Sequence, residues 1–333
     1  MMKKHFLNKM MVCAVTGILT VGSLLGTQSV FGATKKESKQ EEIKVAYMAK
    51  NVVDAFAVSM NDKAGEILDG MKEEGLIADW QLFDATTDPS LQVSQVEDAI
   101  TAGFNFFLLQ PCETTGSDPV VTRCKDAGYP IVVINAKTDS TLAEATGYAG
   151  SDDVQAGEMM GEYIKEAFPE GCKYVHMMGV VGNSAQVDRG TGIANILKEA
   201  DGYENCSDYA AEWLAEKAVG FATDAITQYG DELKAIICDN DDMSSAVQAY
   251  CNSVNRSDIK CIGVDGNQGP LQMIKNGTLE ATILQDGVGQ VEYAVDTIAR
   301  AVITGETEGV EMFKSDIPFI YVDKENVDEY IKE

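Results

Sequence analysis

Histidine is nearly absent from this chain. Only two histidines, His5 and His176, occur among its 333 residues. Zinc sites built from several histidines are therefore excluded, and a Ser-His-Asp or Cys-His arrangement would depend on His176 alone. That residue lies inside the apolar run KYVHMMG, which predicts a strand interior. The sequence also contains no G-x-G-x-x-G, G-x-S-x-G or P-loop motif. These absences argue against a hydrolase or a dehydrogenase, so we expect no enzymatic activity.

Positive charge is scarce as well. The chain has 26 Lys and Arg residues against 53 Asp and Glu residues, which gives a formal net charge of −27. Binding to a phosphate backbone requires clustered positive charge, and an anionic membrane surface repels an acidic protein. The composition therefore excludes nucleic acid as a partner.

Long apolar runs are missing except at the N-terminus. Lys3, Lys4 and Lys9 precede an apolar stretch from Met10 to about Leu25, and small and polar residues follow. This order predicts a secretory signal peptide over residues 1–32, with Val30 and Gly32 before the cleavage point. An uncleaved membrane anchor is the alternative. Residues 33–42 then form a charged, flexible tether.

The predicted signal peptide implies export to the periplasm or the cell surface. Cys13 lies inside the apolar run after Met-Met-Val, which is a poor lipobox, so we expect no lipid anchor. Seven further cysteines are an odd number, and no pair has C-x-x-C spacing. Several of them, including Cys238 and Cys261, interrupt apolar runs, so we interpret them as buried free thiols. Disulfides are the alternative, because an exported protein permits them.

Strand-like and helix-like segments alternate along the rest of the chain. Ile43–Met48 is a short apolar run, and from Ser59 apolar residues recur with a helical period. This alternation occurs in two successive sets, which predicts an α/β fold with two doubly wound parallel sheets. The predicted strands are 43–48, 80–83, 104–109, 131–135, 148–151, 174–179, 205–209, 235–239, 259–264, 281–284 and 319–322, and a long helix is predicted over 288–304.

Amide and carboxylate side chains follow most of these strands. In open α/β sheets, ligands bind outside the carboxyl ends of the strands. Asp and Asn are also common in turns and helix N-caps, which is the alternative explanation. Planar polar groups can form paired hydrogen bonds to neighbouring hydroxyls of a sugar, and aromatic rings can pack on its C–H face. The strand-end residues are Asn51, Asp54, Asn135, Asp239, Asn240, Asp265 and Gln285, to which Arg189, Phe56 and Trp213 add a charge and two rings.

Six stretches, in this order, resemble the bacterial periplasmic sugar-binding proteins of ABC importers, in the branch of the ribose- and glucose/galactose-binding proteins. The resemblance covers about residues 42–333, and the stretches are DAFAVSMNDKA, YAGSDDVQAGEMMGEYI, VDRGTGI, ICDNDDM, IGVDGNQGPLQMIKNGTLEATILQ and YVDKENVDEY. The resemblance implies a type I periplasmic binding protein fold, in which two lobes are joined by a three-segment hinge. The lobes would comprise residues 43–150 with 286–314 and residues 151–285 with 315–333, and would cross near 150–152, 285–287 and 314–316.

The resemblance also assigns the residues that would bind the sugar. Asn135 and Trp213 match the hexose binders of the family, whereas Gln285 matches the ribose binders. Ala185 stands where the hexose branch has an aspartate, so one hydroxyl contact is lost or moved. The implied set is Asp54, Phe56, Asn135, Asn183, Arg189, Trp213, Asn240, Asp265 and Gln285.

The family's calcium loop has no counterpart here. The segment PEGCK is too short for an oxygen-rich loop, and DNDD at 239–242 lacks the spread of ligands that calcium requires. We therefore expect no metal and no cofactor.

The resemblance implies a monomeric protein that captures a monosaccharide, with a hexose such as galactose or glucose favoured, and delivers it to the permease of an ABC transporter. A sugar sensor that reports to a chemoreceptor or histidine kinase is the alternative. A transcriptional repressor with the same core would need a basic helix-turn-helix in place of the predicted signal peptide.

Overall fold

The computed structural model describes residues 42–332, and Glu42–Glu333 form one compact unit. The predicted signal peptide, and the predicted tether up to residue 41, lie outside the described residues. Within the described part of the chain, no helix is long and apolar enough to cross a membrane.

The first sheet is six-stranded and entirely parallel, as its apolar sequence predicts. Its strand order is β12-β5-β4-β3-β1-β2. Strands β3 and β4 are buried along their whole length, which is expected where helices cover both faces. The strands are β1 (Lys44–Ala49), β2 (Asp79–Asp84), β3 (Phe106–Leu109), β4 (Ile131–Ile134), β5 (Gly147–Ala149) and β12 (Phe313–Lys314).

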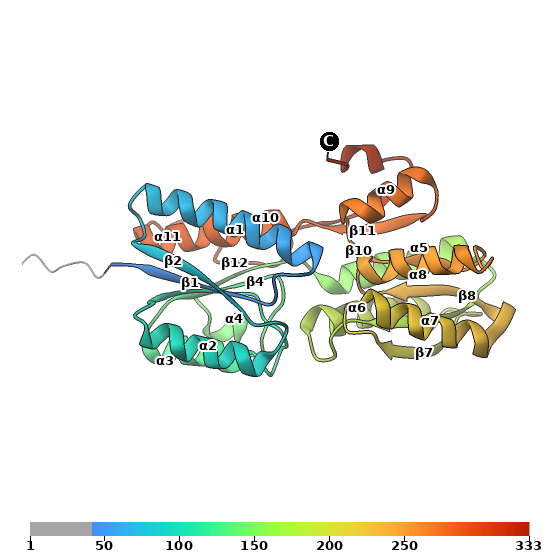
Figure 1. The fold of residues 1–333 in the computed structure, drawn as a ribbon, viewed down its shortest axis with the longest axis horizontal. Helices are drawn as coiled ribbons and strands as arrows, with labels where there is room; N and C mark the ends of the chain where they lie inside the picture. Colours follow the sequence, from blue (N-terminus) through green and yellow to red (C-terminus); the bar gives the residue numbers. More distant parts are fainter. Residues whose placement is uncertain (1–41, 333) are drawn as a thin grey trace, which may run out of the picture. The chain divides into compact units, whose positions relative to one another are not determined.

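Helices cover the two faces of this sheet (Figure 1). Neighbouring residues of β1 point to opposite faces: Tyr47 packs with Met60 of α1, and Met48 packs with Val96 of α2. The predicted long helix over 288–304 is present as three successive segments, the middle one π-helical. One face carries α1 (Ala55–Glu73), α10 (Gly287–Val291), η2 (Glu292–Ala299) and α11 (Arg300–Thr304), and the other carries α2 (Pro89–Thr101) and α3 (Asp118–Ala127).

The second half of the chain builds two smaller sheets. One is parallel with the order β7-β6-β8-β9, and the other has the order β10-β11-β13. The single strand predicted over 259–264 is divided into β9 and β10 at Gly263. The strands are β6 (Lys173–Met178), β7 (Glu204–Ala210), β8 (Leu233–Cys238), β9 (Lys260–Ile262), β10 (Val264–Asp265), β11 (Ala281–Gln285) and β13 (Phe319–Asp323).

One strand pair departs from the all-parallel expectation. Strand β13 runs antiparallel to β11, with Phe319 at its start opposite Gln285 at the end of β11. The chain reaches β13 a few residues after β12 and so enters the sheet at the edge where β11 ends. A strand that enters at this edge must run in the opposite direction.

Five helices accompany the second half. Among them, α5 and α6 approach each other closely because Gly157 faces the backbone of Arg189, where an added Cβ would overlap the Arg189 carbonyl. The helices are α5 (Asp153–Ala167), α6 (Ser184–Leu197), α7 (Ala215–Tyr229), α8 (Asp241–Ser253) and α9 (Gln268–Asn276). Three short elements were not predicted: α4 (Thr141–Glu144), η1 (Gly230–Glu232) and η3 (Val327–Glu329).

The seven cysteines of the described chain are free thiols. Six are buried, and only Cys206 is half-buried. Cys124 lies in the core between the first sheet and α2 and α3, whereas Cys238, Cys251 and Cys261 lie together in a core of the second half. These thiols pack as small apolar side chains.

Candidate functional site

One pocket is lined by all nine residues that the resemblance assigns to the sugar, whereas Asn51 and Asp239, which are also strand-end residues, do not line it. Asp265 and Gln285 are the last residues of β10 and β11, and Arg189 lies within α6. The others lie in loops or helix starts after β1, β4, β6, β7 and β8, so the carboxyl ends of strands from all three sheets meet there. Their role in binding a sugar stays a prediction. The lining residues are Lys50, Asp54, Phe56, Asn135, Asn183, Ala185, Arg189, Trp213, Asn240, Asp242, Asp265 and Gln285.

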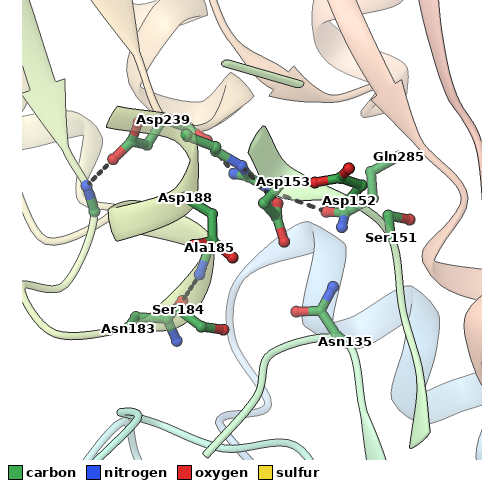
Figure 2. A network of polar contacts seen from close by, with 12 residues as sticks. Asn135, Ser151, Asp152, Asp153, Asn183, Ser184, Ala185, Asp188, Asp239 and Gln285 are labelled. Carbon is green, nitrogen blue, oxygen red and sulfur yellow. Dashed lines mark hydrogen bonds and ion pairs between the residues drawn. The ribbon is translucent and has the colours of Figure 1, made fainter. Parts of the chain in front are cut away.

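Arg189 is the most heavily bonded member of the pocket. Its guanidinium is 3% exposed and forms an ion pair with Asp153, with 2.9 Å between Nη2 and Oδ1. Nε donates to the same oxygen over 3.0 Å, and Nη2 donates to Oε1 of Gln285 over 3.1 Å. Nη1 donates to the backbone carbonyl of Asp239. Figure 2 shows Asp239, Asp153 and Gln285 around these contacts. The fork of donors is thus fixed before any ligand arrives.

Asp153 supplies the negative charge that a buried guanidinium needs. It is the first residue of α5 and is 1% exposed. Burial raises the pKa of its carboxyl group, and Arg189 opposes that rise. Removing either partner would leave the other charge buried and unpaired, which is strongly destabilising. Asp153 therefore belongs to the framework behind the pocket.

Asp265 is a buried carboxylate with few partners. Among the described residues, its side chain accepts a hydrogen bond only from Nδ2 of Asn267, at 3.3 Å from Oδ2, and the residue is 8% exposed. Burial, followed by the charge of Asp241, raises its pKa well above the usual value, while Arg189 opposes the rise. Asp265 does not cap α9, because Asn267 occupies the N-cap position. The carboxylate is therefore left available to a ligand in the pocket.

Three of the seven non-glycine residues with positive φ in the described part of the chain line this pocket. Asn135, Trp213 and Asp265 have φ angles of 68°, 66° and 140°. Residues other than glycine seldom adopt such angles, and such residues cluster at binding sites. For Asn135 the surroundings explain how the strain is held: its backbone carbonyl accepts from the Tyr148 hydroxyl over 2.7 Å, and its Nδ2 donates to Oε1 of Gln290 over 2.9 Å.

Two buried donors in the pocket have no hydrogen-bond partner. Among the described residues, three buried side-chain nitrogen or oxygen atoms are unpartnered, and two of them are Nε2 of Gln285 and Nε1 of Trp213. An unpartnered buried donor is costly, at about 1–3 kcal/mol. Both atoms belong to pocket-lining residues, so a ligand with acceptor oxygens would remove this penalty.

The two aromatic residues of the pocket, Phe56 and Trp213, come from distant parts of the sequence. Phe56 belongs to α1, and its ring packs against Gly287, where an added Cβ would lie 2.6 Å from Cζ. Trp213 lies against Gly179, where an added Cβ would overlap the indole ring. Two cations approach the indole: Lys50 Nζ lies 5.5 Å and Arg189 Cζ lies 5.8 Å from the ring centroid.

Three of the predicted residues also cap helices. Asp54 accepts from the backbone N–H of Ala57 over 2.6 Å at the start of α1, and Asn183 and Asn240 accept from backbone N–H groups at the starts of α6 and α8. Burial would raise the pKa of Asp54, but Lys50 and the hydrogen bonds to Asp54 hold it below its usual value. The capping explanation is thus correct for these residues, although each also lines the pocket.

Sequence reasoning missed two charged members of the pocket. Lys50 follows β1 directly, with its Nζ 3.8 Å from Oδ2 of Asp54. Asp242 is the second residue of α8, and burial and the charge of Asp54 raise its pKa. Lys50 lies one position before the strand-end residue Asn51, and Asp242 lies two positions after the strand-end residue Asn240. Position at a strand end was therefore the available signal for both.

Segments from the two halves of the chain meet beside the pocket. Nδ2 of Asn183 donates to the backbone carbonyl of Cys112 over 3.0 Å. The backbone N–H of Thr114 donates to the backbone carbonyl of Gly182 over 2.9 Å. Lys137 donates through its backbone N–H to Oγ of Ser184 over 2.8 Å, and its Nζ lies 3.2 Å from Oδ2 of Asp188. These contacts join the loops after β3 and β4 to the start of α6.

The described residues hold no group of three or more His, Cys, Asp and Glu side chains arranged to bind a metal ion. The three carboxylates of the pocket, Asp54, Asp242 and Asp265, are interleaved with amides, two cations and two aromatic rings. Such a surface suits a polar, uncharged ligand with both hydroxyl groups and an apolar face.

Comparison with known proteins identifies the architecture. Residues 45–307 match the periplasmic binding protein domain. A putative rhizopine-binding protein of Rhizobium meliloti is 29% identical over 298 residues, which is 86% of this chain and 94% of that protein. A ribose import binding protein of Bacillus subtilis is 30% identical over 204 residues, or 61% and 65% of the two chains.

A solved structure shows the same fold. An ABC transporter solute binding protein from Bacillus halodurans with bound myo-inositol superposes with a TM-score of 0.78 at 26% identity, and the match covers 87% of this chain and 97% of that one. The fold class expected from the sequence is thereby confirmed.

Proposed function

This chain belongs to the periplasmic binding protein family, and we propose that it captures a monosaccharide or a similarly sized cyclic polyol for an ABC importer. Members of this family bind solutes and do no chemistry on them. The protein would act as an exported monomer that passes its ligand to a membrane permease.

One observation carries this proposal. The nine side chains that the resemblance assigns to the sugar, spread over more than 230 residues, line a single pocket. The pocket combines buried charge, amides and two aromatic rings, which together match a ring with hydroxyl groups at its rim. The unpartnered donors of Gln285 and Trp213 would each find an acceptor in such a ligand.

Among sugars, we propose a hexose such as galactose or glucose as the first candidate. Asn135 and Trp213 support it through the resemblance to hexose binders, whereas Gln285 resembles the ribose binders and Ala185 removes one side-chain contact. The relatives broaden the range, since they are named for ribose or rhizopine and one solved structure holds myo-inositol.

Binding would be accompanied by hinge closure. The chain leaves the first sheet after β5, returns to it after β11 and leaves it again after β12. These three passages lie near the predicted crossings and support a hinge of three segments. We propose that residues 43–150 with 286–314 form one lobe and residues 151–285 with 315–333 the other. Contacts such as Lys137–Asp188 would then form only when the lobes close, so a ligand that binds both lobes selects the closed form.

The relatives favour import over sensing. The ribose import binding protein carries the import role in its name, and the matched solved structure is named as an ABC transporter component.

Phe56 and Trp213 would pack on the two sides of the ligand ring, with Asp265, Arg189 and the amides at its edge.

A thermal-shift screen tests the proposal. The panel should contain pentoses, hexoses, inositols and methyl-galactosides, because a ligand that binds only the folded protein raises the melting temperature. We expect a rise of several degrees with at least one member, followed by a calorimetric stoichiometry of one. No rise with any sugar or polyol at millimolar concentration would overturn the proposed function.

A further inference from the structure

A second cavity is lined by residues of α6 that do not line the pocket. It has a volume of about 720 Å³ and lies between α6 and the strands β6 and β7. His176, in the middle of β6, lines this cavity, although the residue itself is only 4% exposed. The family resemblance gives this histidine no role. His176 does not line the binding pocket, so the function of this buried imidazole in β6 has to be sought in its contacts.

His176 is held between two carboxylates. Its Nε2 lies 2.7 Å from Oδ1 of Asp239 at the end of β8, and its Nδ1 lies 3.6 Å from Oδ1 of Asp208 on β7. Asp239 is fully buried, whereas the Asp208 side chain is 52% exposed. A buried carboxylate is stable only when paired and hydrogen-bonded. Among the described residues, His176 is the cationic side chain that pairs with the Asp239 carboxylate.

Asp239 links this histidine to the pocket. Its Oδ2 accepts from the backbone N–H of Gly179 over 2.8 Å, and its backbone carbonyl accepts from Nη1 of Arg189. Gly179 is the residue against which the Trp213 ring lies. Figure 2 shows Asp239 in the same network as Asp153 and Gln285. The position of Asp239 thus sets both the Arg189 fork and the seat of the indole.

The charges around His176 favour its protonated form. Burial alone would lower its pKa, but Asp239 and Asp208 outweigh burial and raise the pKa to about 9. Helix α6 places Gly190 over the ring, where an added Cβ would lie 3.7 Å from Cε1. The other titratable groups that line the cavity are Tyr174 on β6, Glu204 on β7, Lys198 at the end of α6 and Tyr203 before β7.

We propose that His176 is a positioning residue for the binding pocket. Its imidazolium holds the Asp239 carboxylate, and through Asp239 it fixes the Arg189 guanidinium and the Trp213 ring where the ligand meets them. This inference rests on the proposed function for the identity of the ligand. It makes affinity depend on the protonation of a group that does not touch the ligand.

Two substitutions at one position test the proposal. His176→Leu removes the charge and both ring nitrogens, so we expect ligand affinity to fall about tenfold, since hydrogen bonds to charged groups are strong. His176→Gln keeps an N–H donor for Asp239, so we expect an affinity within about threefold of the wild type at pH 7. Calorimetry with the best ligand of the screen, well below each variant's melting temperature, gives both values.

The pH profile separates positioning from mere stability. Below pH 8 the wild-type imidazole is charged and the affinity should be constant; it should fall severalfold between pH 8 and pH 10, as the proton is lost through a pKa of about 9. His176→Gln has no proton to lose there, so its profile should be flat relative to the wild type. Any other group that titrates in this range is present in both proteins and would affect them equally.

Fluorescence gives a readout that needs no ligand. The chain has two tryptophans, so Trp80→Phe leaves Trp213 as the reporter. In that background, His176→Leu should shift the emission of Trp213, whereas Tyr203→Phe, on the same cavity, should not.

Parallel pH profiles for the wild type and His176→Gln, or an unchanged affinity and unchanged emission in His176→Leu, would refute the positioning role. If Asp265→Ala lowers affinity while His176→Leu does not, the positioning role fails and the proposed function stands. If no sugar or polyol binds the wild type, both fail.

Discussion

Residues 151–285 contribute a network of buried charges to the pocket. Residues 50–135 contribute side chains that are mostly half-buried and bonded within their own loops. Arg189 is joined to Asp153, Asp239 and Gln285, and Asp265 is buried beside it. Across the pocket, Asp54 caps its own helix and pairs with the neighbouring Lys50.

This difference indicates a division of work between the two sides. Buried charges in fixed positions discriminate strongly between ligands, because an unmatched charge is left without a partner. Half-buried groups on loops contribute shape and modest contacts, and they exchange readily with water. We therefore expect substitutions on the network side to change affinity more than substitutions on the loop side.

The largest effect should come from Asp265→Ala. The variant removes a buried carboxylate that is left available to ligand hydroxyls, so affinity should fall about a hundredfold, since bonds to a charged group contribute about 1.5–3 kcal/mol each. The melting temperature without ligand should not fall, because burial and neighbouring carboxylates already disfavour this charge.

Asp241→Ala is the matched control for that variant. Asp241 is the buried first residue of α8. Its carboxylate accepts from the backbone N–H groups of Gly266 and Asn267 and from the Thr282 hydroxyl. It does not line the pocket, so its removal should lower the melting temperature instead. Calorimetry and thermal unfolding on both variants give the comparison, and an Asp265→Ala protein with normal affinity would remove Asp265 from the site.

Trp213→Ala should have the next largest effect. A buried aromatic anchor contributes about 2 kcal/mol, which corresponds to a loss of affinity of about thirtyfold. Trp80 is the natural control, because it packs against the first core and donates to Asp69 over 2.7 Å, far from the pocket residues. Trp80→Ala should therefore reduce stability with little change in affinity. Equal affinity losses in the two variants would contradict the stacking role.

Lys50→Met tests the loop side of the pocket. The lysine approaches the Trp213 ring and pairs with Asp54 at 3.8 Å, and both side chains retain contact with water. Partly exposed contacts of this kind are worth about 0.5–1 kcal/mol, so affinity should fall only about threefold. Lys63→Met, on α1 outside the pocket, should leave affinity unchanged. A loss as large as that of Asp265→Ala would abolish the proposed difference between the sides.

The smallest expected effect is that of a chelator. Because the sequence lacks the family's calcium loop, EDTA should change neither the melting temperature nor the sugar affinity. Thermal unfolding with and without EDTA, followed by addition of calcium, measures this. A drop that calcium reverses would show that a cation holds the structure together.

The fold could be predicted because its signals are local. Apolar residues recur with a helical period along α1 and fill both faces of β3, and such patterns depend only on neighbours in sequence. The antiparallel direction of β13 and the two-residue strand β12 could not be predicted, because they are fixed by where the chain re-enters a sheet.

The pocket was predictable to the extent that it follows from strand ends. Asn135 and Asp265 stand at the ends of apolar runs, so their place could be deduced from the sequence. The bond between His176 and Asp239 could not, because it joins residues 63 positions apart through the pairing of β6 with β8. The contribution of Lys50 likewise depends on where the Trp213 ring lies in three dimensions.

The buried thiols can report transient opening of the cores in which they lie. Burial raises the pKa of Cys124 and Cys238, so in the folded state these groups are protonated and shielded from alkylating reagents. Each can react only while the core around it is transiently open, and the two lie in different cores. Alkylation followed by mass spectrometry should therefore time the opening of each half separately, with the half-buried Cys206 modified first.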